Sequence, residues 1–208
     1  MVGEGVLLEC LQNPAVARIL MINRRPYPLQ HPRLQELLVP DFLHIESVAS
    51  QLSGFDACFF CAGVTSVGKS EADYTRITYD TTLHFASTLA ALNPQMTFIY
   101  VSGAGTDSTE QGRTMWARVK GRTENALTRL PFRQAYNFRP GFMQAMPGQR
   151  NLPTLYKIFA PLAPLLLKLL PNHASTLKQV AQAMIQCTTR GYPRQILEVR
   201  DIKTQATS

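Results

Sequence analysis

The chain contains 208 residues, of which 45% are hydrophobic and 17% are charged. This length and composition predict a single globular domain covering residues 1–208 with a substantial buried core, and they exclude a disordered chain. The formal net charge of +7 favours anionic partners such as phosphate-bearing small molecules. Because no run of basic residues is longer than the pair Arg24 and Arg25, the pattern argues against a nucleic-acid-binding tail.

The four cysteines favour a reducing compartment, and no signal peptide precedes them, so a cytoplasmic location is expected. Cys58 and Cys61 have the spacing of a metal or redox motif. They fall on one predicted strand, however, where residues three apart point to opposite faces, so both thiols cannot reach one ion. Buried structural cysteines are therefore favoured over a metal site. The four histidines show no metal-ligand spacing either.

The N-terminal region predicts a helix and then a strand. The first five residues lead directly into the amphipathic run Val6–Leu11, which is typical of the start of a helix. Arg18–Asn23 is a continuous apolar segment, as expected of a buried parallel strand. The proline-rich segment Tyr27–Pro40 predicts an irregular loop with a short helix.

Two further strands and a long helix are predicted next. Phe42–Ile45 is expected to be a short strand and Phe55–Cys61 a longer one, which is followed by Ala62 and Gly63. A glycine at the end of a strand lets the backbone approach a bound molecule closely, although it is also common in an ordinary turn. The apolar spacing of Ser70–Leu92 predicts a helix that packs on the core.

The centre of the chain predicts a buried strand, a glycine-containing loop and a helix. Thr97–Val101 is β-branched and aromatic, and Ser102 follows it directly. The helix extends to Leu130, and Trp116 and Lys120 are four residues apart, so they share one helix face. In an open α/β sheet, ligands bind at the carboxyl ends of the strands, where Ser102 and the start of this helix lie.

The C-terminal part predicts two strands and two helices, in the order Ala135–Arg139, Leu155–Leu170, Thr176–Cys187 and Gln195–Val199. The first strand is ended by Pro140. The strongly apolar helix Leu155–Leu170 is interrupted by Pro161, Pro164 and Lys168 and is shorter than the about 20 residues of a membrane span. A core or substrate-pocket helix is favoured over one that lies on a membrane surface.

These elements resemble the atypical branch of the short-chain dehydrogenase/reductase superfamily, near the NAD-dependent epimerase/dehydratase and NmrA-like proteins. The family places a Ser or Thr after the fifth strand and Tyr-x-x-x-Lys on the next helix, and the matching residues here are Ser102 and Trp116-Ala-Arg-Val-Lys120. Cys61-Ala-Gly63 and Arg139-Pro-Gly141 also match. The resemblance implies a Rossmann-like, doubly wound parallel α/β sheet and an NADP-linked oxidoreductase or epimerase-like protein acting on a carbonyl or alcohol substrate.

The resemblance also implies which residues hold the cofactor and which act on the substrate. Ser102 and Lys120 are the implied catalytic residues, although capping of the loop is an equally acceptable role for Ser102. The implied cofactor-binding residues are Gly3, Asn23, Arg24, Arg25, Cys61, Ala62, Gly63, Lys120 and Pro140. NAD-binding members place an acidic residue after the second strand, whereas arginines there favour a 2′-phosphate. The arginine pair therefore predicts NADP rather than NAD.

The sequence departs from the family at the catalytic tyrosine. The tyrosine phenol exchanges a proton with the substrate in the family, whereas the indole N–H of Trp116 is a donor only. A non-catalytic NAD(P)-binding sensor or scaffold is therefore the alternative function.

The second departure is at the start of the chain. The family's first strand and most of its glycine turn have no counterpart, and only Gly3 matches the third glycine. The chain is therefore expected to be a fragment or to have a misassigned start, unless another segment or chain fills the gap. Without the first strand, the second and fourth strands have no common neighbour. The chain as given is therefore expected to bind NADP weakly or not at all and to be unstable or aggregation-prone.

Overall fold

The computed structural model describes residues 1–152 and 162–207. The chain forms two compact units, and each contains segments that are distant in the sequence. The first unit consists of Met1–Pro40, Pro140–Tyr192 and Leu197–Ser208, and the second of Asp41–Arg139 and Pro193–Ile196. The single domain that the sequence predicted stays a prediction.

The second unit is built on a sheet with the strand order β3-β4-β5-β8. The strands are β3 (Ala57–Phe60), β4 (Thr97–Val101), β5 (Gln134–Arg139) and β8 (Ile196–Glu198). The β3–β4 and β4–β5 pairs are parallel, and all of β4 except Val101 is buried. A central parallel strand is covered on both faces, which explains its continuous apolar sequence. The predicted strands from 55, 97 and 135 are thus present.

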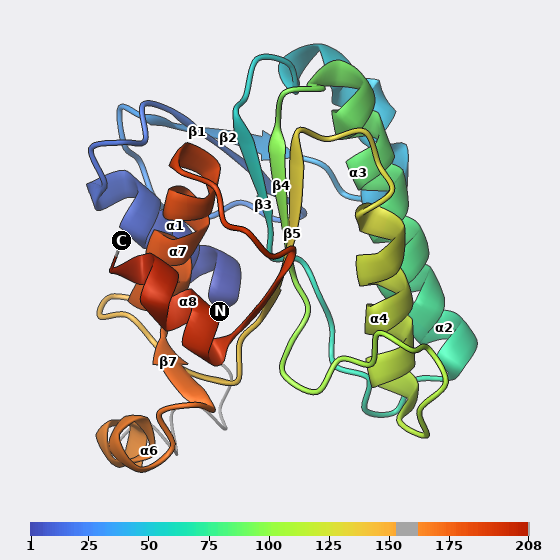
Figure 1. The fold of residues 1–208 in the computed structure, drawn as a ribbon. Helices are drawn as coiled ribbons and strands as arrows, with labels where there is room; N and C mark the ends of the chain where they lie inside the picture. The colour runs from blue at the N-terminus through green and yellow to red at the C-terminus, as the bar shows by residue number, and fades with distance from the viewer. Residues whose placement is uncertain (153–161, 208) are drawn as a thin grey trace. The chain divides into compact units, whose positions relative to one another are not determined.

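Helices α3 (Thr81–Leu92) and α4 (Met115–Leu127) lie on the same side of this sheet (Figure 1). The predicted helix from Ser70 to Leu92 consists of α2 (Glu71–Thr75), a π-helical turn η2 (Arg76–Asp80) and α3. Ser70 caps its start by accepting a hydrogen bond from the Asp73 backbone N–H.

The predicted strand Phe42–Ile45 is wrong. This segment belongs to the 3-10 helix η1 (Phe42–Gln51), which has two internal kinks. The Asp41 side chain accepts a hydrogen bond from the Leu43 backbone N–H at 3.0 Å and so caps a helical turn instead of a strand. Ile45 is the one buried residue of η1. The apolar residues that predicted a strand therefore contribute a single side chain to the core.

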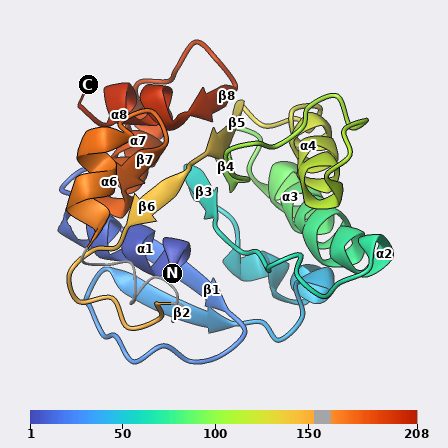
Figure 2. The same ribbon diagram turned by 90° about the horizontal axis from the view of Figure 1, so that it is seen from below.

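The first unit begins with helix α1 (Val2–Gln12) and the parallel pair β1 (Ile19–Asn23) and β2 (Leu34–Leu38), which Figure 2 shows side by side. The prediction of a short helix within Tyr27–Pro40 is wrong, because residues 34–38 form β2. The local sequence Leu-Gln-Glu-Leu-Leu is compatible with a helix. Pairing with β1 in register, Ile19 opposite Leu34, overrides that local preference.

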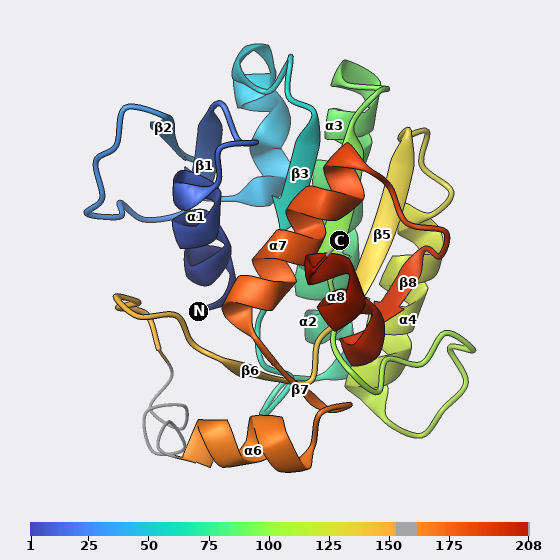
Figure 3. The same cartoon turned by 60° about the vertical axis from the view of Figure 1, so that its left-hand side comes forward.

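The rest of the first unit contains the parallel pair β6 (Phe142–Gln144) and β7 (Ala174–Thr176), and helices α6 (Ala163–Leu169), α7 (Leu177–Thr189) and α8 (Val199–Ala206). Figure 3 shows α7 between α1 and α8. Thr176 and Gln179 form a capping box at the start of α7, as predicted for Thr176. Of the predicted helix Leu155–Leu170, residues 155–161 lie outside the described residues and α6 represents the rest. Helix α8 was not predicted.

Strands β1 and β3 belong to different sheets. They are the strands that the sequence resemblance matched to the family's second and fourth, and among residues 1–152 and 162–207 no strand pairs with both of them. Strand β3 is consequently an edge strand, and β1 is paired only with β2 in the part of the chain that the structure describes.

Glycine 121 permits a close approach between α4 and the loop before it. A Cβ atom on this residue would lie 1.7 Å from the backbone oxygen of Asp107. We expect Gly121→Ala to lower the free energy of unfolding by about 3 kcal/mol or more, because backbone must move to remove the clash. Urea denaturation measures the change. Gly63→Ala is the control, since no heavy atom lies within 4 Å of its Cβ, and a similar loss there would contradict the packing argument.

Candidate functional site

The site in the second unit lies at the carboxyl ends of β4 and β5, where α4 faces Ser102. The Ser102 hydroxyl donates to Glu124 Oε1 at 2.5 Å, and the Phe138 backbone oxygen lies 3.1 Å away as an alternative acceptor. Arg139 donates from Nε to Glu124 Oε1 at 3.0 Å and from Nη2 to Oε2 at 2.5 Å. Glu124 therefore joins the ends of both strands to α4.

This cluster is almost fully buried. The Glu124 side chain is 1% exposed and that of Arg139 is 11% exposed. A buried carboxylate is tolerated only when it is paired and hydrogen-bonded, and both conditions hold here. The hydroxyl of Ser102, itself buried, is turned toward Glu124, so its proton is used within the protein. Ser102 thus has a definite structural role, and its catalytic role stays a prediction.

The loop between β4 and α4 is tied to the same cluster. Arg139 Nη2 donates to the Ser108 hydroxyl at 2.5 Å, and the Asp107 backbone N–H donates to the Ala117 oxygen at 3.1 Å. The hydrogen bond from the Thr109 hydroxyl, together with the Gly112 backbone N–H, lowers the pKa of the Asp107 carboxyl. The loop is therefore organised by its own carboxylate and by the buried arginine.

Lys120 lies next to Ser102. The sequence had placed Ser102 and the start of the following helix at the same end of the sheet. Its ammonium donates to the backbone oxygen of Ser102. Burial lowers the pKa of the Lys120 amine to about 8, although the charge of Glu124 opposes that change. An amine with a pKa near neutrality can hold or release a proton under physiological conditions. Trp116 is on the same helix and lies close to Gly105, whose Cβ would be 3.6 Å from its Cη2 atom.

Residues after β3 provide an accessible backbone. Ala62 and Gly63 are exposed, and a Cβ on Gly63 would meet nothing within 4 Å. Burial raises the pKa of the Cys58 thiol far above its ordinary value, which makes it inert. Within the described residues, no three His, Cys, Asp or Glu side chains are grouped so that they could hold a metal ion.

The remaining predicted cofactor residues lie in the first unit. Arg24 and Arg25 are exposed after β1, and the amide of Asn23 donates to Glu36 Oε1 at 3.2 Å. Gly3 is exposed in α1, so the close helix contact falls instead at Gly5, whose Cβ would lie 2.8 Å from Leu177 Cδ1. Pro140 begins the segment that leads into β6, and its role stays a prediction.

A cavity of about 500 Å³ follows the arginine pair in the first unit. It is lined by Tyr27, Pro28, Leu29, Gln30, His31, Leu34 and Glu36. Its volume is within the range of small-molecule sites. The sequence did not indicate this cavity, because the segment was predicted to be an irregular loop. Glu36, one of the lining residues, belongs to β2, and its position follows from the pairing of β2 with β1.

Two acidic residues that organise these regions were also missed. Glu124 was missed because an acidic residue on an amphipathic helix is usually exposed. Glu4, in the first turn of α1, accepts hydrogen bonds from the Tyr27 hydroxyl at 2.7 Å and from the backbone N–H groups of Arg150 at 2.6 Å and Asn151 at 2.9 Å. Burial raises the pKa of Glu4, but these hydrogen bonds outweigh it and leave the pKa lowered.

Comparison with known proteins supports the fold assignment. No family model matches the chain. It is 29% identical over 136 residues to leucinostatins biosynthesis cluster protein T of Purpureocillium lilacinum, covering 62% of this chain and 49% of that protein. It is 27% identical over 158 residues to the mitochondrial protein fmp52 of Emericella nidulans, covering 73% of this chain and 65% of that protein. The chain thus spans less than two thirds of either curated relative.

Solved structures resemble this chain over nearly its full length. DesIV, a dTDP-glucose 4,6-dehydratase from Streptomyces venezuelae solved with NAD and TYD bound, has a TM-score of 0.68 at 14% identity, covering 99% of this chain and 76% of that one. The ADP-L-glycero-D-manno-heptose-6-epimerase of Helicobacter pylori has a TM-score of 0.66 at 14% identity, covering 91% and 69%. The chain therefore has the Rossmann-like α/β fold of epimerase/dehydratase-like short-chain dehydrogenases/reductases, and the resemblance noted in the sequence is confirmed at the level of the fold.

The lowered pKa of Lys120 predicts a specific pH dependence of stability. Between about pH 8 and the ordinary lysine value of 10.5, the unfolded chain binds this proton and the folded chain does not, so Lys120 makes stability rise with pH. Between pH 7 and pH 10, this effect raises the free energy of unfolding by roughly 2–3 kcal/mol. We expect a Lys120→Met variant to lack this rise when urea denaturation is measured near pH 7 and near pH 10.

The comparison between wild type and variant isolates the effect of Lys120. Buried groups such as Cys58 and Tyr100 have raised pKa values and lower stability over part of the same range. Their contribution is common to both proteins and cancels in the difference. Lys178→Met, which removes an exposed lysine, controls for the loss of charge. An identical pH dependence in wild type and Lys120→Met would contradict the buried-amine assignment.

Proposed function

We propose that the chain is an NADP-linked oxidoreductase or epimerase-like protein that acts on a carbonyl or alcohol of a small molecule in the cytoplasm. The observation on which this rests most is the position of Lys120 beside the end of β4, with an amine of pKa about 8 against the backbone of Ser102. A lysine there can hold ribose hydroxyls or a proton without assistance from a metal.

The neighbouring structures support a nicotinamide dinucleotide as the cofactor. DesIV was solved with NAD, and MoeE5 was solved with UDP-glucuronic acid and NAD. The residues present here fit such a group in part. The exposed backbone at Ala62 and Gly63 admits a close approach, and Lys120 can donate to hydroxyls. When bound, the dinucleotide would supply hydride transfer, while this chain's residues orient the substrate and exclude water.

A non-catalytic NAD(P)-binding sensor or scaffold is the second candidate, and two observations favour it. Trp116 stands in place of the ionisable phenol and cannot exchange a proton. The Ser102 hydroxyl donates to Glu124, so it is occupied within the protein. In this candidate function, cofactor binding changes the protein without turnover.

Substitution at position 116 distinguishes the two functions. If Trp116 marks a lost proton donor, Trp116→Tyr should raise turnover at least tenfold with some carbonyl substrate, since positioned acid–base groups contribute typically 10²–10⁴-fold. Oxidation of NADPH, followed by absorbance across a panel of aldehydes, ketones and nucleotide sugars, measures the gain. Trp116→Phe is the matched control, because it changes size without supplying a hydroxyl. Equal activity of both variants would argue against the lost-catalysis account.

The arginine pair predicts the cofactor preference. The variant Arg24→Ala with Arg25→Ala should weaken NADPH binding about tenfold or more, since a charge-assisted contact with the 2′-phosphate is worth roughly 1.5–3 kcal/mol, while NADH binding changes little. Isothermal titration calorimetry measures both affinities. Arg129→Ala with Arg133→Ala removes the same charge from two exposed positions of the second unit and serves as the control. Equal losses for both cofactors would show that the pair acts only through general charge.

A further inference from the structure

Helix α6 exposes a row of leucines that no described part of the chain covers. Leu162, Leu165, Leu169 and Leu170 are 48%, 52%, 64% and 46% exposed. The sequence favoured a core or substrate-pocket helix here. The exposure of these leucines contradicts the core helix for the described residues 162–170, and the substrate-pocket helix stays a prediction. Large leucines gathered on one short helix form an exposed apolar patch of the kind that marks an interaction surface.

Helix α6 contacts the first unit through part of its surface. Ala163 is 2% exposed, and Leu166 and Leu167 are partly buried. At its C-terminal end, the backbone N–H groups of His173 and Ala174 donate to the Leu170 oxygen at 2.9 and 3.0 Å, which joins α6 to β7. The exposed leucines therefore belong to a helix whose C-terminal end is joined directly to a strand of the first unit.

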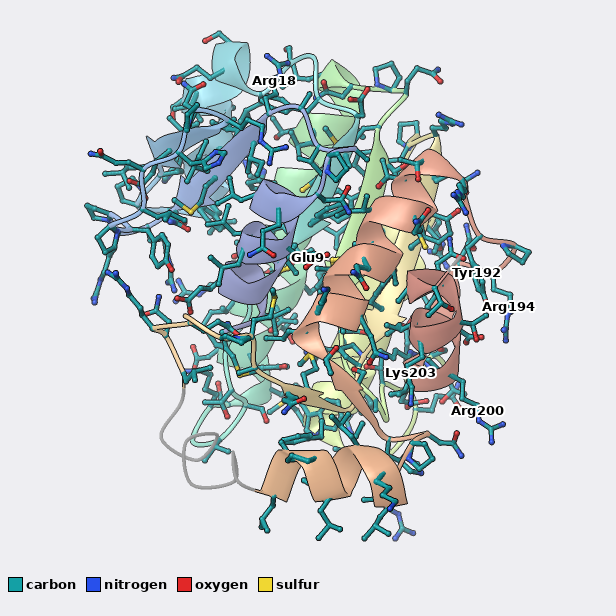
Figure 4. All side chains as sticks on the ribbon, turned by 90° about the vertical axis from the view of Figure 1, so that its left-hand side faces the viewer. Glu9, Arg18, Tyr192, Arg194, Arg200 and Lys203 are labelled. Atoms are coloured by element: carbon teal, nitrogen blue, oxygen red, sulfur yellow. The ribbon has the colours of Figure 1, made fainter. Side chains whose placement is uncertain are left out.

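The sequence on both sides of α6 is basic. Residues 140–192 contain no Asp or Glu, and their basic residues are Arg150, Lys157, Lys168, Lys178 and Arg190. Lys168 is exposed on α6 itself. Two side chains of α8 reach the segment that follows α6, because Arg200 Nε donates to Asn172 Oδ1 at 2.6 Å and Lys203 Nζ donates to the Pro171 oxygen at 3.0 Å. Figure 4 shows these two basic residues on α8.

The two acidic residues at the start of α8 are hydrogen-bonded within the protein. Asp201 is buried and accepts a hydrogen bond from the Tyr192 hydroxyl at 2.9 Å. Glu198 caps the start of α8, where its side chain accepts from the Asp201 backbone. An apolar patch bordered by Lys168, Arg200 and Lys203 is thus complementary to a surface that is apolar inside and negatively charged outside.

We propose that this patch attaches the protein to the surface of an anionic lipid membrane. The leucines of α6 enter the boundary between headgroups and acyl chains, and Lys168, Arg200 and Lys203 contact the lipid phosphates. None of the described helices is long and apolar enough to span a bilayer, so the attachment proposed is interfacial. A second copy that met this patch with its own residues 140–192 would bring basic groups against basic groups, because that segment contains no Asp or Glu.

Flotation of the purified full chain with lipid vesicles tests the proposal, which does not depend on the proposed function. We expect binding to vesicles of phosphatidylcholine mixed with phosphatidylglycerol, weaker binding to phosphatidylcholine alone, and release by added salt. Leu165→Ser with Leu169→Ser should lower the vesicle partition coefficient about tenfold or more, because burial of apolar side chains is lost. Val67→Ser, at a side chain that is 83% exposed outside α6, should leave it unchanged.

A second variant tests the basic rim separately. Lys168→Gln with Arg200→Gln should reduce binding to the anionic vesicles by roughly tenfold and leave binding to phosphatidylcholine unchanged. Arg129→Gln with Arg133→Gln removes the same charge from the second unit and should have little effect. Circular dichroism confirms that each variant is folded. Failure of the wild type to bind anionic vesicles, or a leucine variant that binds as the wild type does, overturns the proposal. So does a leucine variant that changes only the oligomeric state in light scattering.

Discussion

The buried ion pair between Glu124 and Arg139 is the interaction on which the second unit's organisation depends. It connects the ends of two parallel strands to one helix, and the same carboxylate accepts a hydrogen bond from the Ser102 hydroxyl. Removal of either partner from such a pair costs about 3–5 kcal/mol, because the other charge is left buried and uncompensated. The pair also sets the electrostatic surroundings of Lys120, since the negative charge of Glu124 supports the ammonium form that burial disfavours.

In this cluster, Ser102 and Lys120 both bind other groups of the protein. Ser102 was an implied catalytic residue, yet its hydroxyl donates a hydrogen bond to the buried carboxylate of Glu124. The Lys120 amine lies at the end of β4, where it donates a hydrogen bond to the backbone oxygen of Ser102. A site of this kind is rigid around its charged groups, which suits the precise placement of a bound molecule.

The sequence predicted the parts of the structure in which local pattern and tertiary context agree. Thr97–Val101 was predictable because a short, uninterrupted apolar run fits a strand covered on both faces. Leu34–Leu38 was not, because its helical preference is overcome by pairing with a distant strand. Glu124 and Glu4 could not be recognised as buried, since their partners lie 15 or more residues away. The leucines of α6 were apolar in sequence, but periodicity does not show whether an apolar face is covered.

Glu4 has a consequence for how anions approach the start of α1. A helix N-terminus normally offers a partial positive charge and free backbone donors to a phosphate. Here a carboxylate of the chain already stands in the first turn and binds the Tyr27 hydroxyl and two backbone N–H groups near residue 150. Any phosphate group that settles at this end of α1 must overcome repulsion from Glu4 or displace the loop that Glu4 holds, so affinity for anions there is coupled to the conformation of a segment almost 150 residues distant in the sequence.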